Sequence, residues 1–431
     1  MLSKRFQIQS GKLIETIHST AKLGAHGVWG SDPTQTGVKR LALSDLDKQI
    51  KDWFIQETKA LGCSIKVDNV GNVFATYPGK NNSALPTGMG SHLDTQPTGG
   101  RYDGIYGVLS GLQVLRTLKE NNFVPNYPIT LVDWCNEEGA RFPMSMMASS
   151  VWAGICSKET VYQLKDVYDN KTTVEDELKR IGYLGDIECS HSANPLKCHF
   201  EIHIEQGPIL ESMQRKIGVV DSAQAYTWIE VTFMGVAQHT GTTPMEFRRD
   251  ALLASSKVIL DINKMAKSHG GLATVGKLDL QPAVVNVIPE KVTFVIDIRH
   301  SDDVAHQEME QEVEKILKDA ALNTIGNGIP LEVSSRTLYK SPVNKFNKDL
   351  VALIESSAKE IVGEDNLHHM VSGAGHDSCC TNRLIPTAMI FVPSKDGISH
   401  NPKEYTDPKE IELGFRVLLE TILKYDSLRT E

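Results

Sequence analysis

The stretch ITLVDWCNEEGARF, residues 129–142, sets a pattern that recurs along this chain of 431 residues. An apolar, strand-like run ends at Cys135 and is followed, after one more residue, by two adjacent carboxylates, Glu137 and Glu138. Neighbouring like charges repel each other, and a strand end offers them no helical partner to offset the repulsion. Paired glutamates at the point where a buried strand surfaces therefore call for an explanation.

Strands, polar loops and helices alternate on either side of that stretch. Alternation of this kind indicates an α/β core in which much of the sheet is parallel. In such sheets, functional sites gather at the carboxyl ends of the strands. The expected strands cover residues 64–67, 73–77, 87–93, 129–135, 199–204 and 386–392, and the expected helices cover residues 46–61, 108–118 and 348–362.

Residues 226–340 follow a different pattern, in which strands alternate between apolar and polar side chains. Strand–helix units of this type predict a small α+β layer with one sheet face covered by helices. We therefore expect a catalytic domain of residues 1–225 and 341–431, interrupted by an inserted domain of residues 226–340. The elements expected in the insertion are strands at 227–234 and 292–298 and helices at about 249–267 and 303–321.

The composition argues against several function classes. A net charge of −9 and the lack of a dense Lys/Arg block argue against a nucleic-acid partner. No apolar run approaches the length of a membrane span, and the first residues lack the apolar core of a secretory signal. Seven scattered cysteines are typical of core thiols in a reducing compartment. We expect a cytoplasmic protein, with a mitochondrial location as the alternative that the basic residues near the N-terminus leave open.

Histidines and carboxylates follow the strand-like runs in five segments: SHLDTQPTGGRYDG, NEEGARF, HIEQG, SGAGHDS and GISHNPKEY. Each alone has an ordinary explanation. His92 fits a hydrogen-bonded histidine at a strand end, and Asp103 fits a turn or cap residue. His203 fits a solvated strand face, and His400 fits a turn before Asn-Pro. Together, however, imidazoles and carboxylates are the ligand set of catalytic zinc and similar first-row ions.

Asp94, two residues after His92, has two explanations that spacing alone leaves equal. A ligating histidine usually donates its second ring N–H to a carboxylate, which fixes the tautomer of the ring. In that case the Asp94 carboxylate orients His92. Alternatively, Asp94 is a loop residue that bonds its own backbone.

The segments HLDTQPTGGRYDG, NEEGARF, HIEQGPILE, HTGTTP, NVIP, DIRHS and SGAGHDS carry a family resemblance. Together they resemble the dinuclear-zinc amidohydrolase and exopeptidase family that includes aminoacylases, and within it the N-carbamoyl-amino-acid hydrolases. The stretches YPGKN, VPNY and FVPSKDGISHN are similar to fungal-type β-alanine synthase, also called β-ureidopropionase. The fold that this resemblance implies is zinc-exopeptidase-like, an α/β fold with a mixed, largely parallel sheet flanked by helices and an inserted α+β dimerisation or lid domain.

The resemblance also implies a metal centre with two Zn²⁺ ions per subunit, for which Mn²⁺, Co²⁺ or Ni²⁺ are alternatives. By position in the motifs, His92 and His203 would bind one ion, and Glu138 and His400 would bind the other. Asp103 would bridge the two ions.

Two catalytic residues are implied in the same way. Glu137 would be the general base and acid. His239 would reach the active site of the partner subunit of a homodimer and stabilise the tetrahedral oxyanion, although its Thr-Gly context also fits an ordinary turn.

The substrate carboxylate would be held by Arg299 and Asn286 from the inserted domain. Arginine suits a carboxylate because its planar fork donates two hydrogen bonds, but Arg299 also fits a surface ion pair with Asp297. Asn286 also fits the turn before Ile288-Pro289. The other residues implied to line the substrate pocket are Gln206, Gly375 and His376.

The implied reaction is hydrolysis of the carbamoyl C–N bond of N-carbamoyl-β-alanine to β-alanine, CO₂ and NH₃, as in reductive pyrimidine degradation. Hydrolases of N-carbamoyl-L-amino acids or of allantoate are alternatives, because their substrates also combine a ureido group with a carboxylate. An exopeptidase or aminoacylase fits the metal ligands but not NEEGARF, HIEQG and SGAGHD. A catalytically silent binding or scaffold protein is the alternative from a different class, and it predicts a missing ligand or base.

Overall fold

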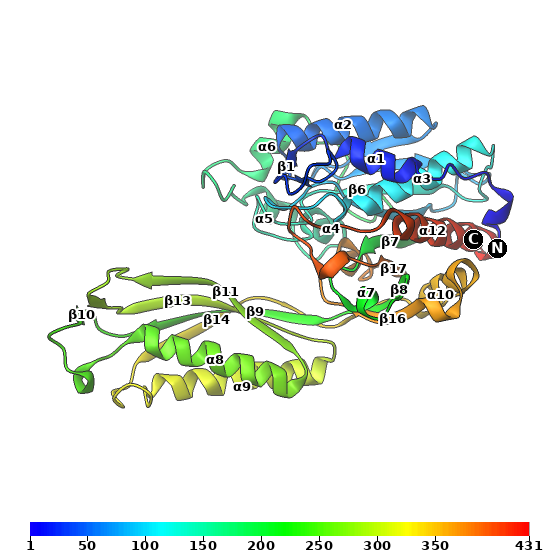
Figure 1. Ribbon diagram of the computed structural model, residues 1–431. Helices are drawn as coiled ribbons and strands as arrows, with labels where there is room; N and C mark the ends of the chain where they lie inside the picture. Colours follow the sequence, from blue (N-terminus) through cyan, green and yellow to red (C-terminus); the bar gives the residue numbers. More distant parts are fainter. Residues whose placement is uncertain (431) are drawn as a thin grey trace. The chain divides into compact units, whose positions relative to one another are not determined.

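The computed structural model describes residues 1–430 and divides into two compact units. The first unit consists of Met1–Asp221 and the residues from Phe346 onward, and the second unit is Ser222–Lys345. Figure 1 shows the second unit in green and yellow, as one continuous insertion in the chain of the first. The inserted domain expected at residues 226–340 lies inside these bounds.

The first unit is built around a mixed sheet in the order β15-β8-β17-β7-β5-β6-β4-β3, with β16 also paired to β8. Its edge strand β15 and the last two residues of β8 fall within the residue range of the second unit. Its centre is parallel, because β17, β7, β5 and β6 all run in one direction. The strands are β3 (Ser64–Val67), β4 (Val73–Tyr77), β5 (Thr87–His92), β6 (Ile129–Trp134), β7 (Cys198–Ile204), β8 (Ile217–Ala223), β15 (Asn344–Lys345), β16 (Leu367–Ser372) and β17 (Thr387–Val392), and a separate ribbon pairs β1 (Ala25–His26) with β2 (Gly37–Val38).

Strand β6 shows why the central strands read as continuous apolar runs. All of its residues are buried, since neighbouring strands lie on both edges and helices on both faces. Leu131 and Asp133 point to one face, where Leu131 lies against α3 and Asp133 accepts a hydrogen bond from Lys51 of α2. Trp134 points to the other face, where its ring packs edge-on against Trp152 of α4 at 5.3 Å.

Helices therefore cover both faces of this sheet. On the α3 face, α1 and α12 pack with α3 and with each other, and α10 packs with α12. On the opposite face, α11 packs with α4. The helices of the first unit are α1 (Lys12–Thr20), α2 (Asp45–Ala60), α3 (Ile105–Glu120), α4 (Met147–Trp152), α5 (Lys158–Tyr162), α6 (Val174–Ile181), α7 (Ile209–Ser212), α10 (Lys348–Val362), α11 (Asp377–Thr381) and α12 (Pro408–Leu428), with short 3₁₀ helices at Ser3–Arg5, Glu364–Asn366 and Lys395–Gly397.

The second unit is an antiparallel sheet in the order β11-β13-β9-β14, covered by two helices. Along β13, Val292, Phe294, Ile296 and Ile298 are buried against these helices, while the residues between them are half-exposed. The elements are β9 (Ala225–Met234), β10 (Gln238–His239), a 3₁₀ helix at Met245–Phe247, α8 (Ala251–His269), β11 (Leu272–Gln281), β12 (Val287–Ile288), β13 (Lys291–His300), α9 (Asp303–Ala321) and β14 (Glu332–Ser341).

The expected α/β fold with a mixed, mostly parallel sheet and an inserted domain is confirmed. The edge strands β11 and β14 were missed, because most of their side chains are exposed and alternate only weakly. Among residues 1–430, no helix is both long enough and apolar enough to cross a bilayer.

Candidate metal centre

The parallel strands bring the candidate ligands to one edge of the first unit. His92 is the last residue of β5, His203 lies near the end of β7, and Glu137 and Glu138 follow β6. Because β5 lies between β6 and β7 and runs parallel to both, their carboxyl ends meet. Asp103 joins them from the turn that begins α3.

Two groups of potential ligands share Asp103. In the first group, Nε2 of His203 lies 3.1 Å and Nε2 of His92 lies 3.8 Å from Oδ1 of Asp103. In the second group, Nε2 of His400 lies 3.3 Å from Oδ2 of Asp103 and 3.4 Å from Oε2 of Glu138. The two oxygens of Asp103 thus face two different sets of nitrogen and oxygen donors.

The turn that carries Asp103 depends on Gly104 and Glu404. Gly104 has φ of +66°, and a Cβ at this position would lie 2.2 Å from the ring of His92. Only glycine therefore allows the turn to approach the ring of His92 so closely. Oε1 of Glu404 accepts the main-chain N–H of Tyr102 and of Asp103, at 3.0 and 3.1 Å.

Asp94 contacts the two glutamates rather than the ring of His92. Its Oδ1 accepts the main-chain N–H of Glu137 at 3.2 Å, and its Oδ2 accepts that of Glu138 at 3.3 Å. Nδ1 of His92 lies 2.9 Å from the main-chain oxygen of Asp94 but 3.9 Å from Oδ1, which is beyond hydrogen-bond distance. The carbonyl of Asp94 therefore orients His92, and the carboxylate orients the loop after β6.

Burial and mutual repulsion shift the pKa values of the paired glutamates. Burial raises the pKa of Glu137 well above its usual range, and the charges of Asp377 and Glu138 add to this effect. Burial and the charge of Asp103 raise the pKa of Glu138 to about 8. Although burial acts in the same direction on Asp103, hydrogen bonds with His203 and His400 outweigh it and hold its pKa well below the usual range.

The pKa values of the three imidazoles are also shifted in different directions. Burial lowers the pKa of His92 to about 4. Burial also disfavours the charged forms of His203 and His400, but Asp103 more than offsets this, and the pKa of each is raised to about 9. The carboxylate of Asp103 thus sets the pKa values of His203 and His400, although Nε2 of His203 also accepts the main-chain N–H of Gly104 at 3.1 Å. His92 is neutral and presents a nitrogen lone pair, as a ligand would.

The arrangement fits bound cations. Asp94, Asp103, Glu137 and Glu138 are each less than a tenth exposed, so four carboxylates share a site that holds water poorly. Such a concentration of negative charge is costly without cations close by. Imidazole nitrogens with carboxylate oxygens, and one carboxylate shared between two sets, suit a pair of first-row metal ions.

A third group with metal-binding spacing, Glu201, His203 and His376, is less suited to an ion. Glu201 already accepts hydrogen bonds from Ser91 and from both the main chain and hydroxyl of Ser378. The ring of His376 packs edge-on against that of His203, with centroids 4.6 Å apart, and so walls the centre. Half-buried Gly375 precedes it in the chain.

Gln206, which was expected to line the substrate pocket, contacts the second ligand group directly. Its Nε2 donates to Oδ2 of Asp103 at 2.8 Å and lies 3.4 Å from Nε2 of His400. Its main chain has φ of +59°, a rare value for a residue with a side chain. Gln206 therefore belongs to the surroundings of the second ligand group.

The second unit carries the remaining predicted residues, at two separate places. His239 on β10 pairs with Val287 on β12, and the main-chain N–H of Thr240 donates to the oxygen of Asn286 at 3.0 Å. Arg299 lies near the other end of the sheet, bonded to Asp297 at 2.7 Å and over the ring of Tyr226.

The length of β13 separates these two places. Arg299 is the ninth of its ten residues, and the β10–β12 ribbon lies at the end where β13 begins (Figure 1). Eight residues of strand span about 26 Å. One chain thus presents Asn286 together with His239 at one place, and Arg299 at another.

Two supporting residues were missed from the sequence. Glu404 lies in the segment GISHNPKEY, but no spacing rule marks it as the acceptor for the Asp103 turn. Gln96 holds Glu138, with Nε2 donating to Oε2 at 2.8 Å and its main-chain N–H donating to Oε1 at 3.1 Å. Both contacts join segments that are distant in the chain, so local pattern carried no signal for them.

The fold and this donor set define a class of protein. The chain belongs to peptidase family M20/M25/M40, whose pattern matches residues 88–424. That range contains both ligand groups that share Asp103, from His92 to His400.

Comparison with individual proteins gives a narrower class than the family does. The chain is 38% identical to an N-carbamoyl-L-amino-acid amidohydrolase of Rhizobium meliloti, over 97% of each chain. It is 33% identical to an allantoate amidohydrolase of Bacillus subtilis, over 85% of this chain and 88% of that one. Among solved structures, an amidase of the hydantoinase/carbamoylase family from Burkholderia multivorans superposes with a TM-score of 0.86 at 41% identity, covering 99% of this chain and 100% of the other. Nothing in these relatives is specific to fungal-type β-alanine synthase.

Proposed function

We propose that this protein is a metal-dependent amidohydrolase that cleaves the carbamoyl C–N bond of an N-carbamoyl-L-amino acid. The observation that carries the proposal is the pair of ligand groups that share Asp103, with Glu137 beside them at 3.4 Å from Nε2 of His92. The relatives with 38% and 33% identity support this chemistry, since both are named as amidohydrolases of ureido compounds.

Two ions, zinc in the first instance, would be held by His92 and His203 on one side and Glu138 and His400 on the other, with Asp103 common to both. When bound, such ions polarise a carbonyl oxygen and lower the pKa of a water to about 7. A ureido carbonyl needs this activation, because electron donation from two nitrogen lone pairs makes it a poor electrophile.

Glu137 is the proton carrier in this proposal. It is buried, and no side chain among the described residues donates a hydrogen bond to its carboxylate, which is therefore available to a water and a substrate. It accepts the proton of the attacking water and returns it to the leaving nitrogen, a role typically worth about 100- to 10,000-fold in rate. Glu138 differs because Gln96 and His400 hold it at the second ligand group.

Substrate recognition is assigned to the second unit. Arg299 would bind the substrate carboxylate with its planar fork. His239 and Asn286 act as one pair, because they lie side by side and at the opposite end of the sheet from Arg299. We assign this pair to the active site of a partner subunit in a homodimer, where His239 would stabilise the oxyanion.

The order of substrates follows the relatives. N-carbamoyl-L-amino acids stand first, allantoate stands second, and N-carbamoyl-β-alanine stands third, because its support was the similarity of short segments alone. The test is a turnover comparison of all three with zinc-loaded protein, measured by release of ammonia. The proposal is supported if the wild type turns over a ureido compound and Glu137→Gln abolishes that turnover. It is contradicted if the metal-loaded wild type turns over none of the three compounds.

A further inference from the structure

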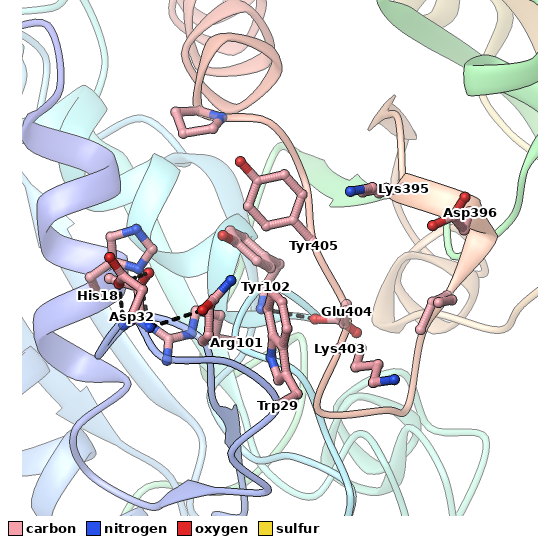
Figure 2. Close-up of a pocket in the computed structure, with 14 residues that line it drawn as sticks. His18, Trp29, Asp32, Arg101, Tyr102, Lys395, Asp396, Lys403, Glu404 and Tyr405 are labelled. Atoms are coloured by element: carbon pink, nitrogen blue, oxygen red, sulfur yellow. Dashed lines mark hydrogen bonds between the residues drawn. The ribbon is translucent and has the colours of Figure 1, made fainter.

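A second cavity lies in the first unit, separate from the metal ligands (Figure 2). Its volume is about 560 Å³, within the usual range of small-molecule sites. Three distant stretches of chain line it: the segment from His18 to Gln35, the pair Arg101 and Tyr102, and the segment from Lys395 to Pro408. No residue of the two ligand groups that share Asp103 belongs to this lining.

Arg101 forms the polar end of the cavity. It is 3% exposed, and its Nε and Nη2 donate to the main chain and hydroxyl of Thr36 at 3.0 and 2.6 Å. Its Nη1 lies 3.0 Å from Nδ1 of His18. Arginine only donates, so Nδ1 of His18 accepts and the ring proton lies on Nε2. Burial lowers the pKa of His18, and the charge of Arg101 adds to this effect, so His18 is a neutral donor here.

Aromatic rings form the middle of the cavity. Tyr102 and Tyr405 meet edge to face, with ring centroids 6.2 Å apart, and Trp29 also lines the cavity (Figure 2). Nε1 of Trp29 is buried and has no hydrogen-bond partner among the described residues. A buried indole N–H normally has an acceptor, so its absence indicates that a ligand provides one.

Three cations and three carboxylates line the cavity. Arg101, Lys395 and Lys403 form no ion pair within residues 1–430. Two of the carboxylates keep their hydrogen bonds within the chain, which leaves the cations as the groups without an ionic partner. Glu404 accepts main-chain N–H groups and the hydroxyl of Ser399, and Asp32 accepts the main-chain N–H and hydroxyl of Thr34. Asp396 lies at the exposed rim beside Lys395.

We propose that this cavity is a second ligand site, which binds a small aromatic carboxylate independently of the metal centre. The ring would pack against Trp29 and Tyr405, and the carboxylate would accept from Trp29 Nε1 and pair with the exposed Lys395 and Lys403. A neutral aromatic ligand would lack the charge that pairs with the cations. A carboxylate without a ring would lack the apolar contact with the aromatic side chains. The site does not depend on the hydrolase assignment, because no lining residue belongs to either ligand group, although Glu404 also holds the turn that carries Asp103.

The test uses the full-length, metal-loaded protein and phenylacetate as the probe, with binding measured by calorimetry and by quenching of tryptophan emission. We expect saturable binding of phenylacetate, and binding of acetate and of phenylacetamide that is at least about tenfold weaker. Phenylacetamide lacks a charge-assisted contact, which is worth about that factor, and acetate lacks the apolar contact of the ring. Trp29→Phe removes the N–H but keeps a ring, and Lys403→Gln removes a surface charge. Each is expected to weaken phenylacetate binding about three- to tenfold.

Two matched variants identify the place of binding. Lys59→Gln removes an exposed lysine outside the cavity, and Arg299→Ala removes the proposed carboxylate contact of the catalytic site. Both are expected to bind phenylacetate as the wild type does. The proposal is overturned if wild-type protein shows no saturable binding, or if Arg299→Ala weakens binding while Trp29→Phe and Lys403→Gln leave it unchanged. Because none of these readouts is turnover, failure of this site and failure of the proposed hydrolase activity are distinguished.

Discussion

The Asp94 carboxylate accepts the main-chain N–H of Glu137 through Oδ1, at 3.2 Å, and its second oxygen accepts that of the next residue at 3.3 Å. One side chain after β5 thus fixes the backbone after the neighbouring strand β6. The two glutamate side chains leave this fixed backbone in different directions, one toward His92 at 3.4 Å and the other toward His400 at 3.4 Å. In the mechanism we propose, that divergence would let one glutamate carry a proton while the other binds metal.

Asp94→Asn tests this positioning. An amide has one acceptor oxygen, so its NH₂ group would face one of the two main-chain N–H donors and that contact would be lost. We expect about a tenfold to hundredfold lower kcat, because small displacements of catalytic groups are costly. The free energy of unfolding should fall by about 1–3 kcal/mol, measured by urea titration. Wild-type kcat with unchanged metal content would show that the carboxylate does not position the glutamates.

Glu137→Gln tests the proton carrier. The amide keeps the shape of the side chain but cannot accept a proton, so turnover should fall by at least about 100-fold. Metal content, measured by mass spectrometry, should stay at the wild-type level, because Glu137 lies outside both ligand groups that share Asp103. Turnover near the wild-type value would remove Glu137 from its role.

Asp103→Ala and Glu138→Ala distinguish a shared ligand from an unshared one. Asp103 belongs to both groups, so its loss should deplete metal at both, whereas loss of Glu138 should affect one. Loss of such a ligand removes a direct metal contact, and we expect affinity to fall by well over about tenfold. The check is metal content per chain after dialysis against a weak chelator. Equal depletion in the two variants would contradict the bridging role of Asp103.

Arg299→Ala tests the carboxylate contact. We expect KM for an N-carbamoyl-L-amino acid to rise by about tenfold or more, with a smaller change in kcat, because the contact is made to the substrate in its ground state. The matched control is Arg336→Ala in the same unit, which removes an exposed arginine paired with Glu230. Equal effects of the two variants on KM would exclude a specific role for Arg299.

Glu177 gives a pH-dependent contribution to stability away from the metal centre. Burial raises its pKa, but hydrogen bonds from Arg180 and Arg141, at 2.6 and 2.8 Å, outweigh burial, so its pKa is lowered in the folded protein. A carboxylate with a depressed folded pKa stabilises the fold above its unfolded pKa, near 4.5. That stabilisation is lost as the pH falls through the folded pKa.

Glu177→Gln should therefore lower the free energy of unfolding at pH 7 by about 1 kcal/mol, a value reduced by solvent screening. The difference from wild type should shrink as the pH falls below about 4.5, in denaturant titrations at several pH values. Glu175→Gln, on the same helix and paired only with Lys179 in the described structure, is the control with a smaller effect. A deficit that persists unchanged at low pH would rule out the charge as its cause.

Much of the fold could be predicted because apolar periodicity is a local property. The continuous run before Cys135 and the alternation from Val292 to Ile298 each appear as a strand of the expected kind. Strands β11 and β14 could not be predicted in this way, since their pairing partners, not their own side chains, define them. The motif residues from His92 to His400 do come together, but a motif carries no distances.

By itself, the sequence determined the α/β core, the inserted domain and the chemical types gathered at the strand ends, because residue order and side-chain period encode these features. Only the tertiary structure decided which atoms meet. It gave Asp103 two sets of neighbours, turned the Asp94 carboxylate to the glutamates instead of His92, and set Asn286 with His239 rather than with Arg299. Hydrogen bonds and ion contacts act over about 3 Å. Partners that are tens to hundreds of residues apart in the chain are therefore chosen by the packing of strands, and their choice is not written in any local pattern.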